Sequence, residues 1–188
     1  MSKDLSDMTL EELWELFPIS LVPHDDTWRR QYEEVEQRLA ELLSGYPVER
    51  ISHIGSTAVD GIWAKDIVDV LVELAADADM GEAVKRLEHG GFTVMADEGE
   101  RVSLNLGYTK DGFADKVYHV HLRRAGDNDE LYFRDYLNAH PQAAKEYEAL
   151  KLRLWKQFEH DRDAYTDAKT DFIESVTTKA RQEYAGRY

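Results

Sequence analysis

The sequence predicts an α/β (α+β) fold of one domain, with a mixed β-sheet flanked by helices and a C-terminal helical segment. Three observations predict it. Apolar residues recur at spacings of three and four near both ends of the chain, which is typical of amphipathic helices. Short apolar or alternating runs lie between them and indicate strands. No repeat, low-complexity segment or linker divides the 188 residues, a length that suits one hydrophobic core.

The first 26 residues are expected to form an N-terminal extension with a short helix. Thr9 and Glu12 have the spacing of a capping box, and Pro18 lies near the expected end of that helix. The single domain is expected to cover residues 27–188. It opens with an apolar stripe from Trp28 to Leu42 that predicts a helix.

The central part of the domain reads as strands interrupted by one helix over 80–89. Residues 66–74 give the clearest strand pattern, in which Val68, Val70 and Val72 face one way. Asp69, Leu71 and Glu73 then face the other way. The other expected strands cover residues 48–54, 92–95, 101–108 and 117–123. Gly107 and Gly112 are expected to bracket the turn between the last two.

The last third of the chain is predicted to be helical. One helix is expected over 131–140, and Pro141 can open the next at its first turn. A third continuous helix is expected over about 163–184.

Composition excludes several classes of function. The chain has no cysteine, so thiol nucleophiles and cysteine-ligated metals are excluded. The net charge of −15 opposes binding to a polyanion, so no nucleic-acid partner is expected. No apolar run approaches the roughly 18 residues of a membrane span and no signal peptide is recognisable, so we expect no membrane association and a cytoplasmic location.

A turn with phosphate-binding chemistry follows the strand over 48–54. Gly55 permits close approach of the backbone to a ligand, and the hydroxyl groups of Ser56 and Thr57 add hydrogen-bond donors. His53 precedes the turn. Glycine–serine turns are common, so an ordinary turn is the competing interpretation.

Asp69 is the first candidate for the chemistry itself. A carboxylate in the middle of an apolar strand is costly unless it is paired or bound to a metal. Glu73 shares its face but lies roughly 13 Å away at the rise of a strand, too far to chelate the same ion directly. The residues alone leave Asp69 either a site residue or a buried hydrogen-bond anchor.

Histidines and isolated cations complete the candidates. His119 and His121 alternate on one strand, so both face the same side and could ligate a metal or hold a phosphate. Lys65, Lys169 and Arg123 could bind an anion. A structural His-x-His pair and solvated surface lysines are the simpler interpretations.

Several motifs in order resemble the GrpB-like family. HIGSTAVDGIWAKDIVDVLVEL at residues 53–74 resembles its leading signature, and VYHVHLR resembles its His-x-His strand. LYFRDYLNAHPQAAKEYEALK at residues 131–151 and RDAYTDAKTDFI at residues 162–173 resemble its C-terminal motifs. The resemblance covers nearly the whole chain.

The resemblance implies a nucleotidyltransferase-like fold with a nucleoside triphosphate and a divalent cation as ligands. By this resemblance Gly55 and Ser56, with Thr57 beside them, match the phosphate-binding turn, and Asp69 matches the first metal-binding acid. Leu71 stands where the second acid belongs, which is a departure from the superfamily. His119 or His121 stands near the position of the third acid.

Three functions follow as hypotheses. The first is transfer of a nucleotidyl or phosphoryl group to a small acceptor, with Mg²⁺ at Asp69, phosphate at Ser56, and Lys65 and Lys169 neutralising charge. The second is a module that binds a nucleotide or a coenzyme A-related ligand without catalysis, which Leu71 favours. The third is a transition-metal site formed by Asp69 with three histidines, His53, His119 and His121, because imidazole and carboxylate together suit Zn²⁺, Mn²⁺ or Fe²⁺ better than Mg²⁺.

Overall fold

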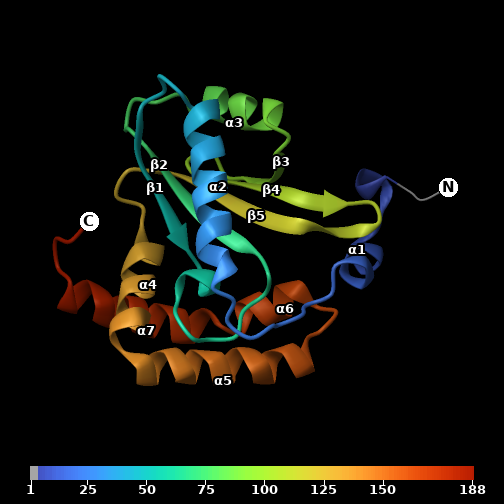
Figure 1. Ribbon diagram of the computed structural model, residues 1–188, viewed down its shortest axis with the longest axis vertical. Helices are drawn as coiled ribbons and strands as arrows, with labels where there is room; N and C mark the ends of the chain where they lie inside the picture. The colour runs from blue at the N-terminus through green and yellow to red at the C-terminus, as the bar shows by residue number, and fades with distance from the viewer. Residues whose placement is uncertain (1–3) are drawn as a thin grey trace.

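The computed structural model describes residues 4–188, so residues 1–3 of the expected extension lie outside the described residues. Four helices at the C-terminal end, α4 to α7, gather at one end of a five-stranded sheet, and α2 crosses one of its faces (Figure 1). The first half of the chain contains η1 Leu5–Asp7, α1 Leu10–Leu16, α2 Thr27–Leu42, β1 Val48–Ile54, η2 Ser56–Ala58, β2 Val68–Leu74 and α3 Met80–His89. The second half contains β3 Thr93–Asp97, β4 Val102–Thr109, β5 Gly112–Arg124, α4 Asp129–Ala139, α5 Pro141–Gln157, α6 Arg162–Asp167 and α7 Thr170–Glu183.

The sheet is mixed, with strand order β1-β2-β5-β4-β3. Only the central pair, β2 and β5, is parallel; the other neighbours are antiparallel. In the β2–β5 register Asp69 lies opposite His119, and Leu71 lies opposite His121. Because paired residues project to the same face of a sheet, this register brings the acid and the first histidine side by side.

The two faces of β2 pack against different layers, as its alternating pattern predicts. Val68, Val70 and Val72 are fully buried against α2 and α3 in the main core. Leu71, on the opposite face, is buried with Ile54 of β1 and Leu131 of α4. The sheet therefore separates an apolar core from a second layer made by the C-terminal helices.

Backbone hydrogen bonds attach the N-terminal segment to the domain. The predicted capping box is confirmed, since the side chains of Thr9 and Glu12 each bond to the other residue's backbone N–H. After α1, the N–H of Ile19 donates to the carbonyl of Glu159 at 2.9 Å. Val22 and Ala64 form a short antiparallel bridge.

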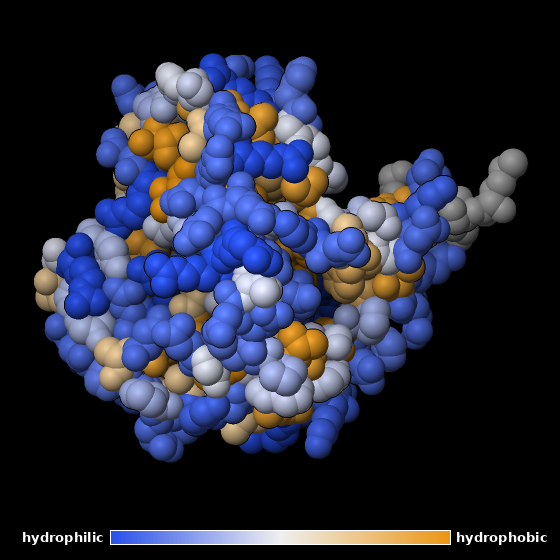
Figure 2. All heavy atoms as spheres, in the orientation of Figure 1, coloured by the Kyte–Doolittle hydropathy of each residue, from blue (hydrophilic) through white to orange (hydrophobic). Residues whose placement is uncertain are grey.

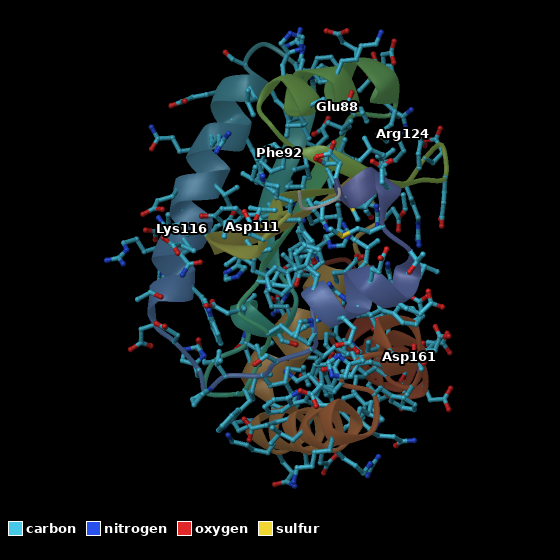
Figure 3. All side chains as sticks on the ribbon, turned by 90° about the vertical axis from the view of Figure 1, so that its right-hand side faces the viewer. Glu88, Phe92, Asp111, Lys116, Arg124 and Asp161 are labelled. Carbon is cyan, nitrogen blue, oxygen red and sulfur yellow. The ribbon has the colours of Figure 1, made fainter. Side chains whose placement is uncertain are left out.

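The outer surface of the face seen in Figure 1 is mostly hydrophilic, with hydrophobic groups visible between charged side chains (Figure 2). Lys116 of β5 reaches α2 and forms an ion pair with Glu34 there (Figure 3). Among residues 4–188, no helix is both long and apolar enough to cross a membrane.

Two expectations about the elements are wrong. The continuous helix over 163–184 is divided into α6 and α7, and Lys169 lies at the break between them. Gly107 lies inside β4 rather than at the turn: the register shifts between Leu106 and Tyr108. Gly107 has φ +97°, and a Cβ there would lie 2.3 Å from the carbonyl oxygen of Lys116, so the bulge requires glycine.

Candidate functional site

A cavity of about 680 Å³ lies between the polar face of the sheet and the C-terminal helices. Its walls come from the turn after β1, from β2 and β5, and from α4, α5, α6 and α7. Its lining includes Gly55, Ser56, Thr57, Lys65, Asp69, His119, His121, Tyr147, Lys151, Tyr165, Lys169 and Arg181. Most residues singled out in the sequence are thus brought together, although they span more than a hundred positions.

The turn after β1 fits tightly against Asp69. Gly55 has φ +72°, a conformation that glycine adopts without strain. A Cβ on Gly55 would lie 2.5 Å from Oδ2 of Asp69. Only glycine at position 55 therefore allows the turn to lie this close to the carboxylate. Thr57 is buried and its Oγ1 lies 2.9 Å from Nε2 of His53, which fixes the base of the turn.

Asp69 is held by both predicted histidines. Its Oδ1 lies 3.3 Å from Nδ1 of His119 and 3.3 Å from Nε2 of His121. Burial acts to raise the pKa of Asp69, but the hydrogen bonds from the two imidazoles outweigh it and hold this pKa below its usual range. Burial also lowers the pKa of His119, so the site contains a carboxylate and neutral imidazole.

Lys65 and Lys169 are not solvated surface lysines, the simpler interpretation of the sequence. Both line the cavity and are half-buried, and their Nζ atoms lie 5.4 and 4.3 Å from the centroid of the same Tyr165 ring. Burial lowers the pKa of Lys65 to about 7 and that of Lys169 to about 8, and each is lowered further by the charge of Arg162.

A third lysine, Lys151, was not among the predicted site residues. It is 2 % exposed, lines the same cavity, and donates to the carbonyl of Trp63. Its Nζ lies 4.8 Å from the centroid of Tyr147, and burial lowers its pKa to about 7. One signal in the sequence could have found it: Lys151 falls four residues after Tyr147, on the apolar stripe of that helix.

Two of the candidate residues, Arg123 and His53, do not line the cavity, and neither does Glu73. Arg123 is buried, and its Nη1 donates to the carbonyls of Leu122 and Val102 at 2.9 and 3.3 Å. The His53 side chain lies against Thr57 at the base of the turn. Glu73 accepts hydrogen bonds from Gly126 and Asn128, which anchors the loop before α4.

The donor set fits a preformed magnesium cage poorly. Asp69 is the carboxylate that the sheet contributes to the cavity, and Leu71 is packed away from it, whereas Asp129, Glu130 and Glu174 line the cavity from α4 and α7. In the part of the chain that the structure describes, no group of three or more His, Asp or Glu side chains is arranged to hold a metal ion. Mg²⁺ is commonly held by one or two carboxylates together with substrate phosphates, and a single acid fits that arrangement.

His53 should make stability depend on pH. Burial lowers its pKa from 6.5 to about 4, so the folded state binds this proton less readily than the unfolded chain. Stability from His53 is therefore complete above pH 6.5 and is lost as pH falls toward 4. In urea titrations, wild type should lose about 1–3 kcal/mol more than His53→Gln between those pH values.

The exposed His160 provides the control for this prediction. His160→Gln should keep the wild-type dependence of unfolding free energy on pH. An unchanged dependence in His53→Gln would contradict the assignment.

Comparisons with known proteins agree with this architecture. Residues 18–179 match the family described as GrpB protein. The glutamate-rich protein GrpB of Alkalihalophilus pseudofirmus is 33% identical over 164 residues, which cover 84% of this chain and 93% of the relative. The crystal structure of the conserved protein GrpB from Enterococcus faecalis superimposes with a TM-score of 0.74 at 26% identity, covering 88% of this chain and 99% of the other.

A more distant likeness identifies the type of fold. The Cid1 poly(U) polymerase matches with a TM-score of 0.52 at 13% identity, covering 85% of this chain and 52% of that chain. At this identity the match concerns the fold alone, which is nucleotidyltransferase-like as the resemblance implies. The family match, the full-length relative and the shared architecture lead to one conclusion: the chain belongs to the GrpB family.

Proposed function

We propose that the cavity binds a nucleoside triphosphate, or a related phosphate ligand, for transfer of a nucleotidyl or phosphoryl group to a small acceptor. The observation that carries the proposal is the convergence of three lysines on one cavity beside the Gly55-Ser56 turn. Lys65, Lys151 and Lys169 are costly to bury as cations, and an anionic ligand between them offsets that cost.

The phosphate chain would lie between the turn and the lysines. Backbone N–H groups at a glycine turn and the Ser56 hydroxyl suit phosphate oxygens, and the three ammonium groups neutralise their charge. Cid1 has been crystallised with MgATP, which supports a nucleotide as the class of ligand for this fold. Mg²⁺ brought by the nucleotide would meet Asp69 and would supply further charge neutralisation at the phosphates.

The choice of acceptor follows from charge. A net charge of −15 disfavours nucleic acid and favours a small neutral or cationic acceptor, such as an amine. The competing proposal is binding without transfer, which the buried Leu71 favours because two-metal catalysis needs more than one acid. Release of pyrophosphate or phosphate from ATP in the presence of small amines separates the two.

Removing a cavity lysine should weaken nucleotide binding. Lys151→Met and Lys169→Met should each raise the Kd for ATP by about 10–100-fold in isothermal titration calorimetry, because a hydrogen bond to a charged group contributes about 1.5–3 kcal/mol. Matched controls are Lys156→Met on α5, the helix of Lys151, and Lys179→Met on α7, the helix that follows Lys169; both remove exposed lysines. Equal effects in cavity and control variants would contradict the proposed site.

The pH dependence of binding tests the same assignment. Lysines whose pKa lies near 7 to 8 lose their charge as pH rises, so ATP should bind more weakly at pH 9 than at pH 7.5. Phosphate groups are already ionised across this range, since their last pKa lies near 6. Wild-type affinity that is constant from pH 7.5 to 9 would count against the lysine cluster.

A further inference from the structure

We infer that Tyr108 and Arg162 are positioning residues that hold His119 in the tautomer whose Nδ1–H faces Asp69. Neither residue lines the large cavity, and neither is a candidate on sequence grounds. Both act through a hydrogen-bonded chain that ends at Asp69. The inference concerns the protein without ligand and does not depend on the proposed function.

The hydrogen-bonded chain begins at the guanidinium of Arg162, a group that can only donate. Arg162 Nη2 lies 3.0 Å from Oη of Tyr108, and a guanidinium has no acceptor, so Tyr108 receives this hydrogen bond. The tyrosine hydroxyl lies 2.9 Å from Nε2 of His119 and directs its own proton there. Nε2 is then an acceptor, and the ring proton resides on Nδ1.

The other end of the chain favours the same tautomer. An ionised carboxylate only accepts, so a proton on Nδ1 of His119, 3.3 Å from Asp69 Oδ1, is the favoured arrangement. Donor and acceptor roles agree at every step from Arg162 to Asp69. The opposite tautomer would leave Nδ1 of His119 without a proton against a carboxylate oxygen.

His121 faces Asp69 through Nε2, the ring nitrogen that His119 turns away from Asp69. Its Nε2 lies 3.3 Å from the same oxygen of Asp69, and its Nδ1 lies 3.4 Å from Nη2 of Arg123. By the same reasoning His121 carries its proton on Nε2. The two histidines therefore donate to one oxygen through different ring nitrogens, with an arginine at each end of the network.

The bulge at Gly107 is what brings Tyr108 to this position. Asn105 pairs with His119, and without a bulge Tyr108 would project to the opposite face of the sheet. At this irregularity Gly107 alone faces residues 114–117 of β5, and beyond it the hydroxyl of Tyr108 reaches His119. Phe17 and Phe113 pack on its ring, with centroids 4.7 and 5.1 Å away, so the segment before the domain helps to hold the ring.

The test is nitrogen NMR of protein labelled with ¹⁵N-histidine at pH 7.5, which distinguishes protonated from bare ring nitrogens. In wild type, His119 should be protonated on Nδ1 alone and His121 on Nε2 alone. Tyr108→Phe keeps the aromatic ring but removes the hydroxyl, so His119 should change to a mixture of tautomers while His121 stays unchanged.

A second pair of variants covers the case in which Tyr108→Phe does not fold. Arg162→Met removes the donor and should also mix the tautomers of His119, whereas Arg162→Lys retains a donor-only cation and should restore Nδ1–H. The inference is overturned if wild-type His119 is protonated on Nε2 or on both nitrogens. It is equally overturned if all folded variants keep the wild-type pattern, since a purely structural role would leave the tautomer unchanged.

Discussion

Leu71→Asp is expected to destabilise the protein by about 4 kcal/mol or more rather than to restore a second metal-binding acid. Leu71 is fully buried between Ile54 and Leu131, and it does not line the cavity. Truncating a buried leucine costs about 2–5 kcal/mol, and an unpaired carboxylate in the same place adds a desolvation cost. Urea denaturation monitored by circular dichroism measures the loss.

Leu71→Met is the matched control for size without charge. It should cost less than about 1.5 kcal/mol, because a flexible apolar side chain of similar volume fills the same place. The expectation is contradicted if Leu71→Asp has wild-type stability and its melting temperature rises with Mg²⁺. That result would mean that α4 moves and leaves room for a second acid.

Gly55→Ala is expected to have the second large effect, and it acts at the site. Alanine at φ +72° and ψ −170° costs about 1–3 kcal/mol in backbone strain, and its Cβ would lie 2.5 Å from Oδ2 of Asp69. The turn or the carboxylate must therefore move. ATP affinity measured by calorimetry should fall more than 10-fold, a change equivalent to more than about 1.4 kcal/mol.

Gly61→Ala isolates the contribution of strain. Gly61 has a similar φ of +69°, and a Cβ there would meet no atom within 4 Å. Its unfolding free energy should fall by the strain alone, and its ATP affinity should stay at the wild-type value. If the two alanine variants lose equal stability and bind ATP equally, the close approach of Gly55 to Asp69 has no energetic consequence.

Elements with strong local patterns were predictable from the sequence. The stripe from Trp28 to Leu42, the capping box at Thr9 and the first-turn proline at Pro141 are each confirmed within a residue or two. The break at Lys169 was not predictable from the apolar stripe, because Tyr165, Phe172 and Val176 suit one helix as well as two.

The site was predictable only in part, for a topological reason. The pattern of β2 places Asp69 on the polar face, and the alternation of β5 places both histidines on one face. Their convergence depends on the parallel pairing of these two strands, which no local pattern specifies. Lys151 and Tyr108 were missed because their positions depend on tertiary structure. The packing of α5 places Lys151 in the cavity, and the bulge in β4 places Tyr108 against His119.

The three cavity lysines belong to different layers of the molecule. Lys65 precedes a strand of the sheet, whereas Lys151 and Lys169 belong to the helical layer. A ligand that contacts all three therefore binds only when the layers are docked, and it stabilises that docking in proportion to the logarithm of its concentration over its Kd. Occupancy of the cavity and closure of the two layers are consequently one linked equilibrium, in which a ligand adds to the apolar contacts that Ile54 and Leu71 make with Leu131.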